Sequence, residues 1–382
     1  MDPYANEWLD FLARWLHVIA GIVWIGTSFY FVALDNHLRD DASWEIHGGG
    51  FYRVQKFTPA PPRLPDLLHW FKWEAYTTWL SGFALLIVLY YVNADTYLID
   101  KSVANLSPAE AIAISVGLLA AAWVVYDVLC RLVRNELVLA VALLGLTTLA
   151  AWGCSHLFSG RAEYIQVGAM LGTMMAGNVF LVIIPAHWEL VRAKQQRREP
   201  DPLPGIRAKQ RSVHNNYLTL PVVFAMLSNH FPSSYGHSYS WLILVALMVT
   251  GAWIRHFFNL RHAGRTVWAI PVTAALAIAG VAVAIRPGGG GGVATAGVAP
   301  FSRVRAIVQQ RCVPCHSSRP TKVAVAPKGI VFDTPEQIAA QASLIERVAV
   351  TTKTMPIGNA TGMTQAERDE LGSWIRAGAK IK

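Results

Sequence analysis

Charged residues are scarce in this 382-residue sequence, where they make up 15% of the chain, against about a quarter in soluble globular proteins. Cysteine is scarce too, and four residues are too few for a disulfide framework. These shortages argue against an ordinary soluble enzyme and against a small disulfide-stabilised secreted protein. The hydrophobic share of 53% favours residence in a membrane.

Long apolar segments recur through residues 1–286, each close to the length that crosses about 30 Å of hydrocarbon. We expect about eight transmembrane helices, near residues 11–34, 75–92, 109–129, 137–158, 165–188, 217–231, 239–258 and 267–285. The sixth is the weakest, because it is short and interrupted by Pro221. The predicted fold class is all-α, with residues 1–286 forming a polytopic membrane helix bundle.

The loops between these segments differ sharply in positive charge. The odd-numbered loops contain nearly all of the loop lysines and arginines, whereas the even-numbered loops contain only Lys101 and Arg161. Positively charged loops stay on the cytoplasmic side, so both termini are predicted to be periplasmic, in a bacterial inner membrane. The net charge of +9 then follows from topology, and the expected partner is membrane lipid rather than nucleic acid.

The chain changes character after residue 286. Residues 287–299 are rich in glycine and other small residues, which predicts a flexible linker. Residues 300–382 have the composition of a soluble protein and are treated as a separate domain. Helix-start signals occur there at Thr334-Pro335 with Gln337, and at Thr364-Gln-Ala-Glu367.

Cys312-Val-Pro-Cys315-His316 in this domain is the signature of covalent haem attachment. The two thiols bond the haem vinyl groups, and the adjacent histidine reaches the iron. A zinc site is the alternative, but no further cysteine or histidine follows in the domain. We therefore predict one covalent haem c in a domain that resembles the small class I cytochromes c. Haem attachment takes place outside the cytoplasm, where the charge pattern independently places this domain.

A methionine usually completes such an iron site and raises its reduction potential. Met355 and Met363 are the two candidates. Met355 is followed by Pro356, which matches the Met-Pro pattern of the cytochrome family, and it is the preferred ligand. Met363 is interpreted as a core-packing residue.

Histidines recur near the ends of the predicted spans. On the predicted topology, three fall toward the periplasmic side and three toward the cytoplasmic side: His17, His156 and His230, then His187, His214 and His256. Histidines facing one another across a bundle can ligate haem b, and each can equally be an ordinary interfacial residue. His17 is the best single candidate, because Gly21 and Gly26 permit close approach of a flat macrocycle or of a neighbouring helix.

The first cytoplasmic loop is long, and long loops are often functional. It contains His47-Gly-Gly-Gly-Phe-Tyr-Arg53, and then His69, Lys72 and Glu74 among aromatic residues. Glycines allow close backbone approach to a ligand, and basic and aromatic side chains would suit a flat anion. The alternative is an aromatic belt at the membrane interface, with basic residues obeying the positive-inside rule.

Several segments carry a family resemblance. They are Arg14-Trp-Leu-His17-Val-Ile-Ala-Gly21-Ile-Val-Trp24-Ile-Gly26-Thr-Ser-Phe-Tyr30, His47-Gly-Gly-Gly-Phe-Tyr52 and Lys72-Trp-Glu-Ala-Tyr-Thr-Thr-Trp79. With the fused haem domain, the whole chain resembles the bacterial membrane-bound urate oxidase (urate hydroxylase, PuuD) family. The resemblance implies oxidation of urate to 5-hydroxyisourate, with electrons passed to cytochrome c rather than to oxygen. It supplies no catalytic residues.

The resulting hypothesis is a membrane-bound urate oxidoreductase that passes electrons through haem c to a downstream respiratory cytochrome or terminal oxidase. The rival is a non-enzymatic electron relay, in which the bundle anchors the cytochrome beside another dehydrogenase or quinol oxidase. A transporter bundle with an attached redox sensor is a third reading. The sequence identifies neither the urate-binding residues nor the membrane side of the substrate site.

Overall fold

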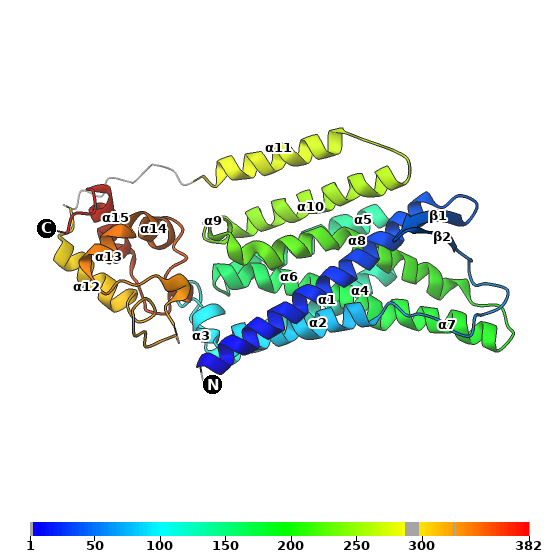
Figure 1. Ribbon diagram of the computed structural model, residues 1–382, viewed down its shortest axis with the longest axis horizontal. Helices are drawn as coiled ribbons and strands as arrows, with labels where there is room; N and C mark the ends of the chain where they lie inside the picture. Colours follow the sequence, from blue (N-terminus) through cyan, green and yellow to red (C-terminus); the bar gives the residue numbers. More distant parts are fainter. Residues whose placement is uncertain (1–2, 287–297, 324, 382) are drawn as a thin grey trace.

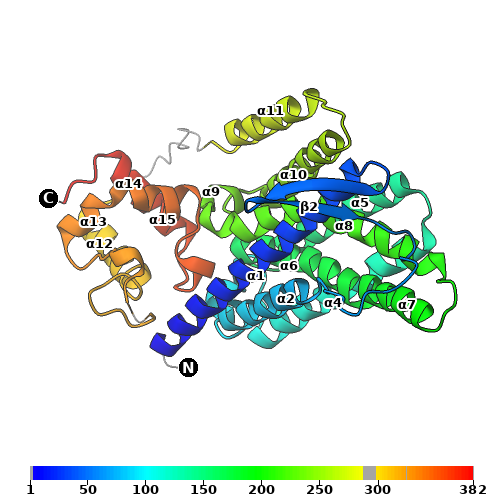
Figure 2. The same ribbon diagram turned by 45° about the vertical axis from the view of Figure 1, so that its right-hand side comes forward.

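The computed structural model describes residues 3–286, 298–323 and 325–381. The N-terminal part consists of α1 (Pro3–His37), β1 (Ala42–His47), β2 (Gly50–Gln55), α2 (Trp73–Leu85), η1 (Leu86–Tyr91), α3 (Ala94–Tyr97), α4 (Pro108–Leu132), α5 (Glu136–Ser155), α6 (Gly160–Gly177), η2 (Asn178–Ile183), α7 (Ile184–Gln195), α8 (Pro202–Leu227), η3 (Ser228–His230), α9 (Pro232–Tyr235), α10 (Ser240–His262) and α11 (Ala269–Ala284). These helices form an elongated bundle. The β-hairpin and α7 lie at one end, and the C-terminal domain lies at the other (Figures 1 and 2).

Each predicted apolar segment falls largely within helix, but not all of them qualify as spans. Five described helices are long and apolar enough to cross a membrane: Trp8–His37, Pro108–Leu132, Glu136–Ser155, Gly160–Gln195 and Ser240–His262. The segment 75–92 falls in α2 and the π-helical turn η1, and 267–285 falls mostly in α11, which has 16 residues. The structure therefore supports five spans, and the number eight stays a prediction.

α8 corrects the prediction for the sixth segment. The helix begins at Pro202, well before residue 217, and continues through Pro221 to Leu227. Asp201 caps its start by accepting the Leu203 amide at 2.9 Å. Residues expected in a cytoplasmic loop thus lie on a helix, and Arg211 among them is buried and pairs with Asp127 of α4 at 2.7 Å. Charge pattern alone could not distinguish a loop from a helix that extends beyond the apolar region.

A small β-hairpin departs from the all-α prediction. β1 and β2 pair antiparallel, and the turn between them contains Gly48 and Gly49, both with positive φ. A two-residue turn of this kind favours glycine, because both central residues need positive φ. A Cβ added at Gly48, Gly49 or Gly50 would meet no atom within 4 Å. Gly48 and Gly49 therefore form the turn and Gly50 begins β2, and ligand binding at these glycines stays a prediction.

The C-terminal domain consists of α12 (Phe301–Arg311), η4 (Pro327–Gly329), α13 (Pro335–Ala340), α14 (Ala342–Ile345), η5 (Glu346–Thr351), η6 (Ile357–Asn359) and α15 (Gln365–Arg376). α12 and α15 pack around an apolar core that includes Val304, Ile307, Leu371 and Trp374. Both predicted helix starts are confirmed, since capping boxes open α13 and α15. Residues 287–297 of the predicted linker lie outside the described residues, and Ala299 already packs into this core.

Candidate functional site

A cavity of about 650 Å³ lies between α1, α7 and α8, at the end of the bundle away from the C-terminal domain. The α1 residues that line the cavity recur at helical spacing, so their side chains lie on one face of the helix: Trp24, Thr27, Ser28, Phe31 and Asp35. α8 contributes Lys209, Ser212, Val213 and Asn216 with the same spacing, and the other walls include His69, Trp70, Phe71, His187 and Asn259. Segments far apart in the sequence therefore build one chamber.

The segment before α2 is held over this cavity by aromatic contacts. Phe71 packs edge-on against Phe31 of α1, with ring centroids 4.9 Å apart. Trp70 stacks on Trp188 of α7 at 4.5 Å, and the Lys72 ammonium lies 5.6 Å from the Trp70 ring centre. Aromatic pairs of this kind contribute about 0.5–1.5 kcal/mol beyond the area they bury. Two helices thus fix the loop as a wall of the cavity.

Positive charge gathers beside the cavity. Asp35 accepts a hydrogen bond from Lys56 at 2.6 Å and another from Lys209 of α8. Because two ammonium groups share one carboxylate, a net positive charge remains. Such a field raises the local concentration of anions.

A buried guanidinium stands behind the polar wall. Arg255 of α10 is 3% exposed, and its Nε donates to Asn216 Oδ1, while Asn216 Nδ2 donates to Asn259 Oδ1 at 3.1 Å. The guanidinium also lies 3.7 Å from the ring centre of Phe29. Its Nη2 is buried and has no hydrogen-bond partner among the described residues. A buried cation without an anionic partner is costly, so this one is suited to a bound anion.

The sequence model of one known family, described as urate oxidase N-terminal, matches residues 3–286. The chain belongs to this family. The match covers α1 to α11 and hence every wall of the cavity. No curated protein and no solved structure matches the chain. Membership of the urate oxidase N-terminal family indicates a urate-related oxidoreductase.

The six histidines proposed for haem b lie at separate places in the urate oxidase N-terminal domain. His187 lines the cavity. His214 Nδ1 contacts Tyr126 Oη at 2.8 Å, His256 Nδ1 contacts Tyr217 Oη at 2.7 Å, and His156 Nδ1 donates to the Trp152 carbonyl at 2.8 Å. His230 lies in η3. Among the described residues, no hydrogen bond joins two of these histidines.

His17 packs tightly between α1 and α2. Its Nδ1 lies 3.0 Å from the Thr78 carbonyl and 3.1 Å from Ser81 Oγ. A Cβ added at Gly82 would lie 2.8 Å from His17 Cε1. A donor bond from Nδ1 to a carbonyl leaves Nε2 as the free ring nitrogen, as in many metal-binding histidines. The His17 ring thus packs closely against Gly82 of the neighbouring helix α2, and haem binding at His17 stays a prediction.

The predicted haem c residues lie together at the end of α12. Cys312 and Cys315 are free thiols, and burial raises the pKa of Cys312 to about 12. His316 Nδ1 donates to the Ile330 carbonyl at 3.0 Å, which leaves Nε2 free to bind iron. Met355 is partly buried against the domain core, whereas Met363 is only 3% exposed within it. These residues fit a covalent haem.

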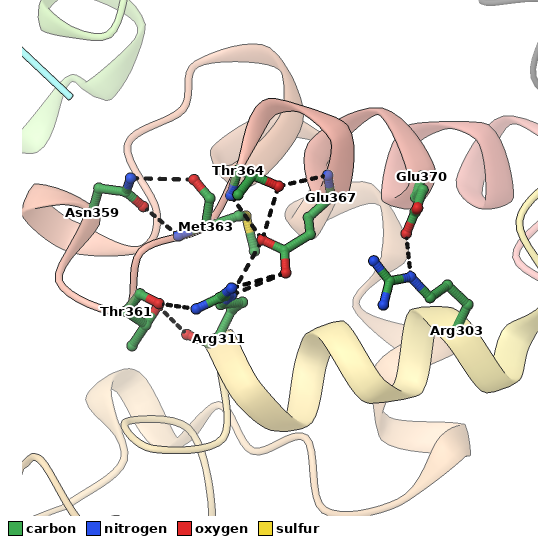
Figure 3. A network of polar contacts seen from close by, with 8 residues as sticks. All are labelled: Arg303, Arg311, Asn359, Thr361, Met363, Thr364, Glu367 and Glu370. Atoms are coloured by element: carbon green, nitrogen blue, oxygen red, sulfur yellow. Dashed lines mark hydrogen bonds and ion pairs between the residues drawn. The ribbon is translucent and has the colours of Figure 1, made fainter.

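A polar network ties the C-terminal end of α12 to α15 (Figure 3). Arg311 precedes Cys312 and pairs with Glu367 at 3.0 Å, and it also donates to the Thr361 carbonyl. Asn359 bonds the Met363 backbone twice, at 2.8 and 3.2 Å. Burial acts to raise the pKa of Glu367, but hydrogen bonds from Thr364 and Arg311 outweigh it and lower that pKa. Met363 is thus fixed through its backbone as well as by core packing.

Sequence reasoning missed Arg255, Asn216 and Asn259. Arg255 lies inside the predicted 239–258 span, and an ionisable residue within a span is itself a signal of function. The prediction for the spans named only histidines as candidate ligands. The amides carry no such signal, because nothing in their local sequence shows that α8 and α10 bring them together.

Proposed function

We propose that this protein is a membrane-bound urate oxidoreductase that converts urate to 5-hydroxyisourate, and that the cavity between α1, α7 and α8 is its substrate site. The observation that carries the proposal is a polar cavity wall backed by the buried guanidinium of Arg255, whose Nη2 has no hydrogen-bond partner among the described residues. Family membership supplies urate as the substrate. Urate is a planar anion at neutral pH, and it matches the cavity in both shape and charge.

The cavity offers urate three kinds of contact. Its volume of about 650 Å³ lies within the usual range for small-ligand sites. Trp24, Phe31 and Trp70 give flat surfaces for a purine ring, while Asn216 and Asn259 give amides for its carbonyl and N–H edges. A bound anion would also relieve the cost of burying Arg255 unpaired.

The overall reaction fits this position. The urate monoanion and one water give 5-hydroxyisourate, two electrons and one proton, with the oxygen of water added at C5. His69 and His187 line the same cavity, and a neutral imidazole can accept the proton of the attacking water. We assign them as the candidate proton acceptors.

Cys312, Cys315 and His316 would hold haem c, with Met355 as the preferred second iron ligand. Bound haem c accepts electrons one at a time, so no oxygen and no peroxide are required. The final acceptor is then a downstream respiratory cytochrome or terminal oxidase. α7, which lines the cavity, and the C-terminal domain, which carries these residues, lie at opposite ends of the bundle (Figure 1), so we propose a further redox group within the bundle. Haem b at one or more of the six histidines is the proposed relay.

The number of membrane spans and their orientation are also part of the proposal. We infer about eight spans in a bacterial inner membrane, with both termini and the C-terminal domain in the periplasm. Two observations support this orientation. The C-terminal domain contacts α3 and the end of α9, and both lie in even-numbered loops, which are poor in positive charge.

Anaerobic incubation of the purified full-length protein with urate tests the function. We expect haem c absorption to change to that of the reduced form, and mass spectrometry to find 5-hydroxyisourate. Ser28→Phe, which fills the cavity, should abolish both signals, whereas Thr266→Phe, at an exposed loop position outside the cavity lining, should not. Inertness of the wild-type protein toward urate would contradict the proposal and favour the non-enzymatic relay.

A further inference from the structure

The C-terminal domain and the membrane domain meet at two glycines, one on each side. A Cβ atom added at Gly358 of η6 would overlap the carbonyl oxygen of Thr96 and lie 2.8 Å from that of Ile99, both in the membrane domain. A Cβ added at Gly236, which ends α9, would overlap the carbonyl oxygen of Thr352. Real Cβ atoms essentially never approach within 3.0 Å. Neither position therefore has room for a side chain.

These contacts flank one short segment, residues 352–358, with Met355 near its centre. Arg368 is buried in the C-terminal domain, and its Nη1 donates to the Met355 carbonyl at 2.7 Å. The negative charge of Asp100, in the membrane domain, attracts this guanidinium across the interface and favours its charged form. The backbone that carries Met355 is thus fixed by the membrane domain at both ends and by Arg368 within its own domain.

We propose that residues 352–358 are the docking surface through which the C-terminal domain receives electrons from the membrane domain. The electron-transfer part rests on the function proposed above, whereas the docking part rests on the two glycine contacts alone. Electron tunnelling weakens steeply with distance. Gly236 and Gly358 act as positioning residues, because a side chain at either position would push the segment that carries Met355 away from α3 and α9.

Gly236→Ala in the full-length protein is the sharpest test, because Gly236 lies outside the C-terminal domain. Its φ of −88° suits alanine, so the expected effect is steric: the added Cβ meets Thr352 and Thr354 of the C-terminal domain and, within α9 itself, the Pro232 carbonyl oxygen at 2.8 Å. We expect residues 352–358 to exchange amide hydrogens roughly tenfold faster than in the wild type. Haem c reduction by urate should slow by about tenfold or more, as misplacement on the order of 1 Å can cost up to a hundredfold. The haem spectrum and direct reduction by dithionite should stay unchanged.

Gly358→Ala should behave similarly, and Gly329→Ala is its matched control. Gly329 also has positive φ, so alanine is equally strained there, but no atom lies within 4 Å of its added Cβ. Wild-type exchange and urate-driven reduction in both Gly236→Ala and Gly358→Ala would overturn the proposal, as would rapid exchange of 352–358 in the wild type. A protein that urate fails to reduce, but in which Gly236→Ala still releases the segment, would refute the proposed substrate and uphold the docking surface.

Discussion

Replacing Arg255 by methionine distinguishes anion binding from a structural role for this side chain. The change leaves Asn216 Oδ1 without its donor, which costs about 1–3 kcal/mol, and loses the cation–π contact with Phe29, worth about 0.5–2 kcal/mol. Removing an unpaired buried charge returns several kcal/mol. These effects oppose each other, so we expect the unfolding free energy of the urate-free protein to change by less than about 2 kcal/mol.

Urate binding should also weaken in the same variant. Arg255 lies behind the cavity wall and orients the amide of Asn216, which lines the cavity. Loss of one well-oriented hydrogen bond from that amide, worth about 0.5–1.5 kcal/mol, should raise the urate Kd by roughly twofold to tenfold. Titration of the purified protein gives the Kd, and thermal unfolding with and without urate gives the stability. Arg261→Met is the control, because Arg261 is exposed in the last turn of α10. An unchanged Kd in Arg255→Met would refute the reasoning.

Three other predictions concern the haem ligands, the topology and the relay. Met355→Ala should keep covalent haem but lower its reduction potential and abolish the sulfur-to-iron absorption band. Met363→Ala should instead lower the unfolding free energy by about 2–5 kcal/mol, because it opens the core. Loss of the absorption band in Met363→Ala alone would reverse the assignment. A periplasm-specific reporter should be active when fused after residue 382 or within 93–107 and inactive within 189–213, and activity at the last site would overturn the eight-span topology. Protein truncated at about residue 286 should keep a non-covalent haem spectrum that His17→Ala weakens, and a folded but colourless product would remove the haem b relay.

Local features of the sequence predicted local structure well. The apolar segments marked the main helices, and the Thr364–Glu367 pair marked the start of α15. One local signal was misread, because Pro221 was expected to interrupt a helix that in fact continues through it. The glycines after His47 lie at a hairpin turn, and a ligand beside them stays a prediction.

The cavity was beyond sequence reasoning for a different reason. Its walls come from α1, the loop at His69, α7, α8 and α10, and helical periodicity describes one helix at a time. Nothing in a single sequence shows which polar faces meet. His69, which the sequence singled out as a candidate for a flat-anion site, lines this cavity, whereas Asn216 and Asn259 became visible only once α8 and α10 were packed together.

The opposite placement of the cavity and the C-terminal domain links urate chemistry to the membrane voltage. In the proposed topology, urate is oxidised near the cytoplasmic face, and its electrons leave at the periplasmic face. An inside-negative potential pushes electrons in this direction. It therefore adds about 2.3 kcal/mol of driving force per electron for each 100 mV. Urate oxidation would accordingly run faster in an energised membrane, and each turnover would discharge part of that voltage.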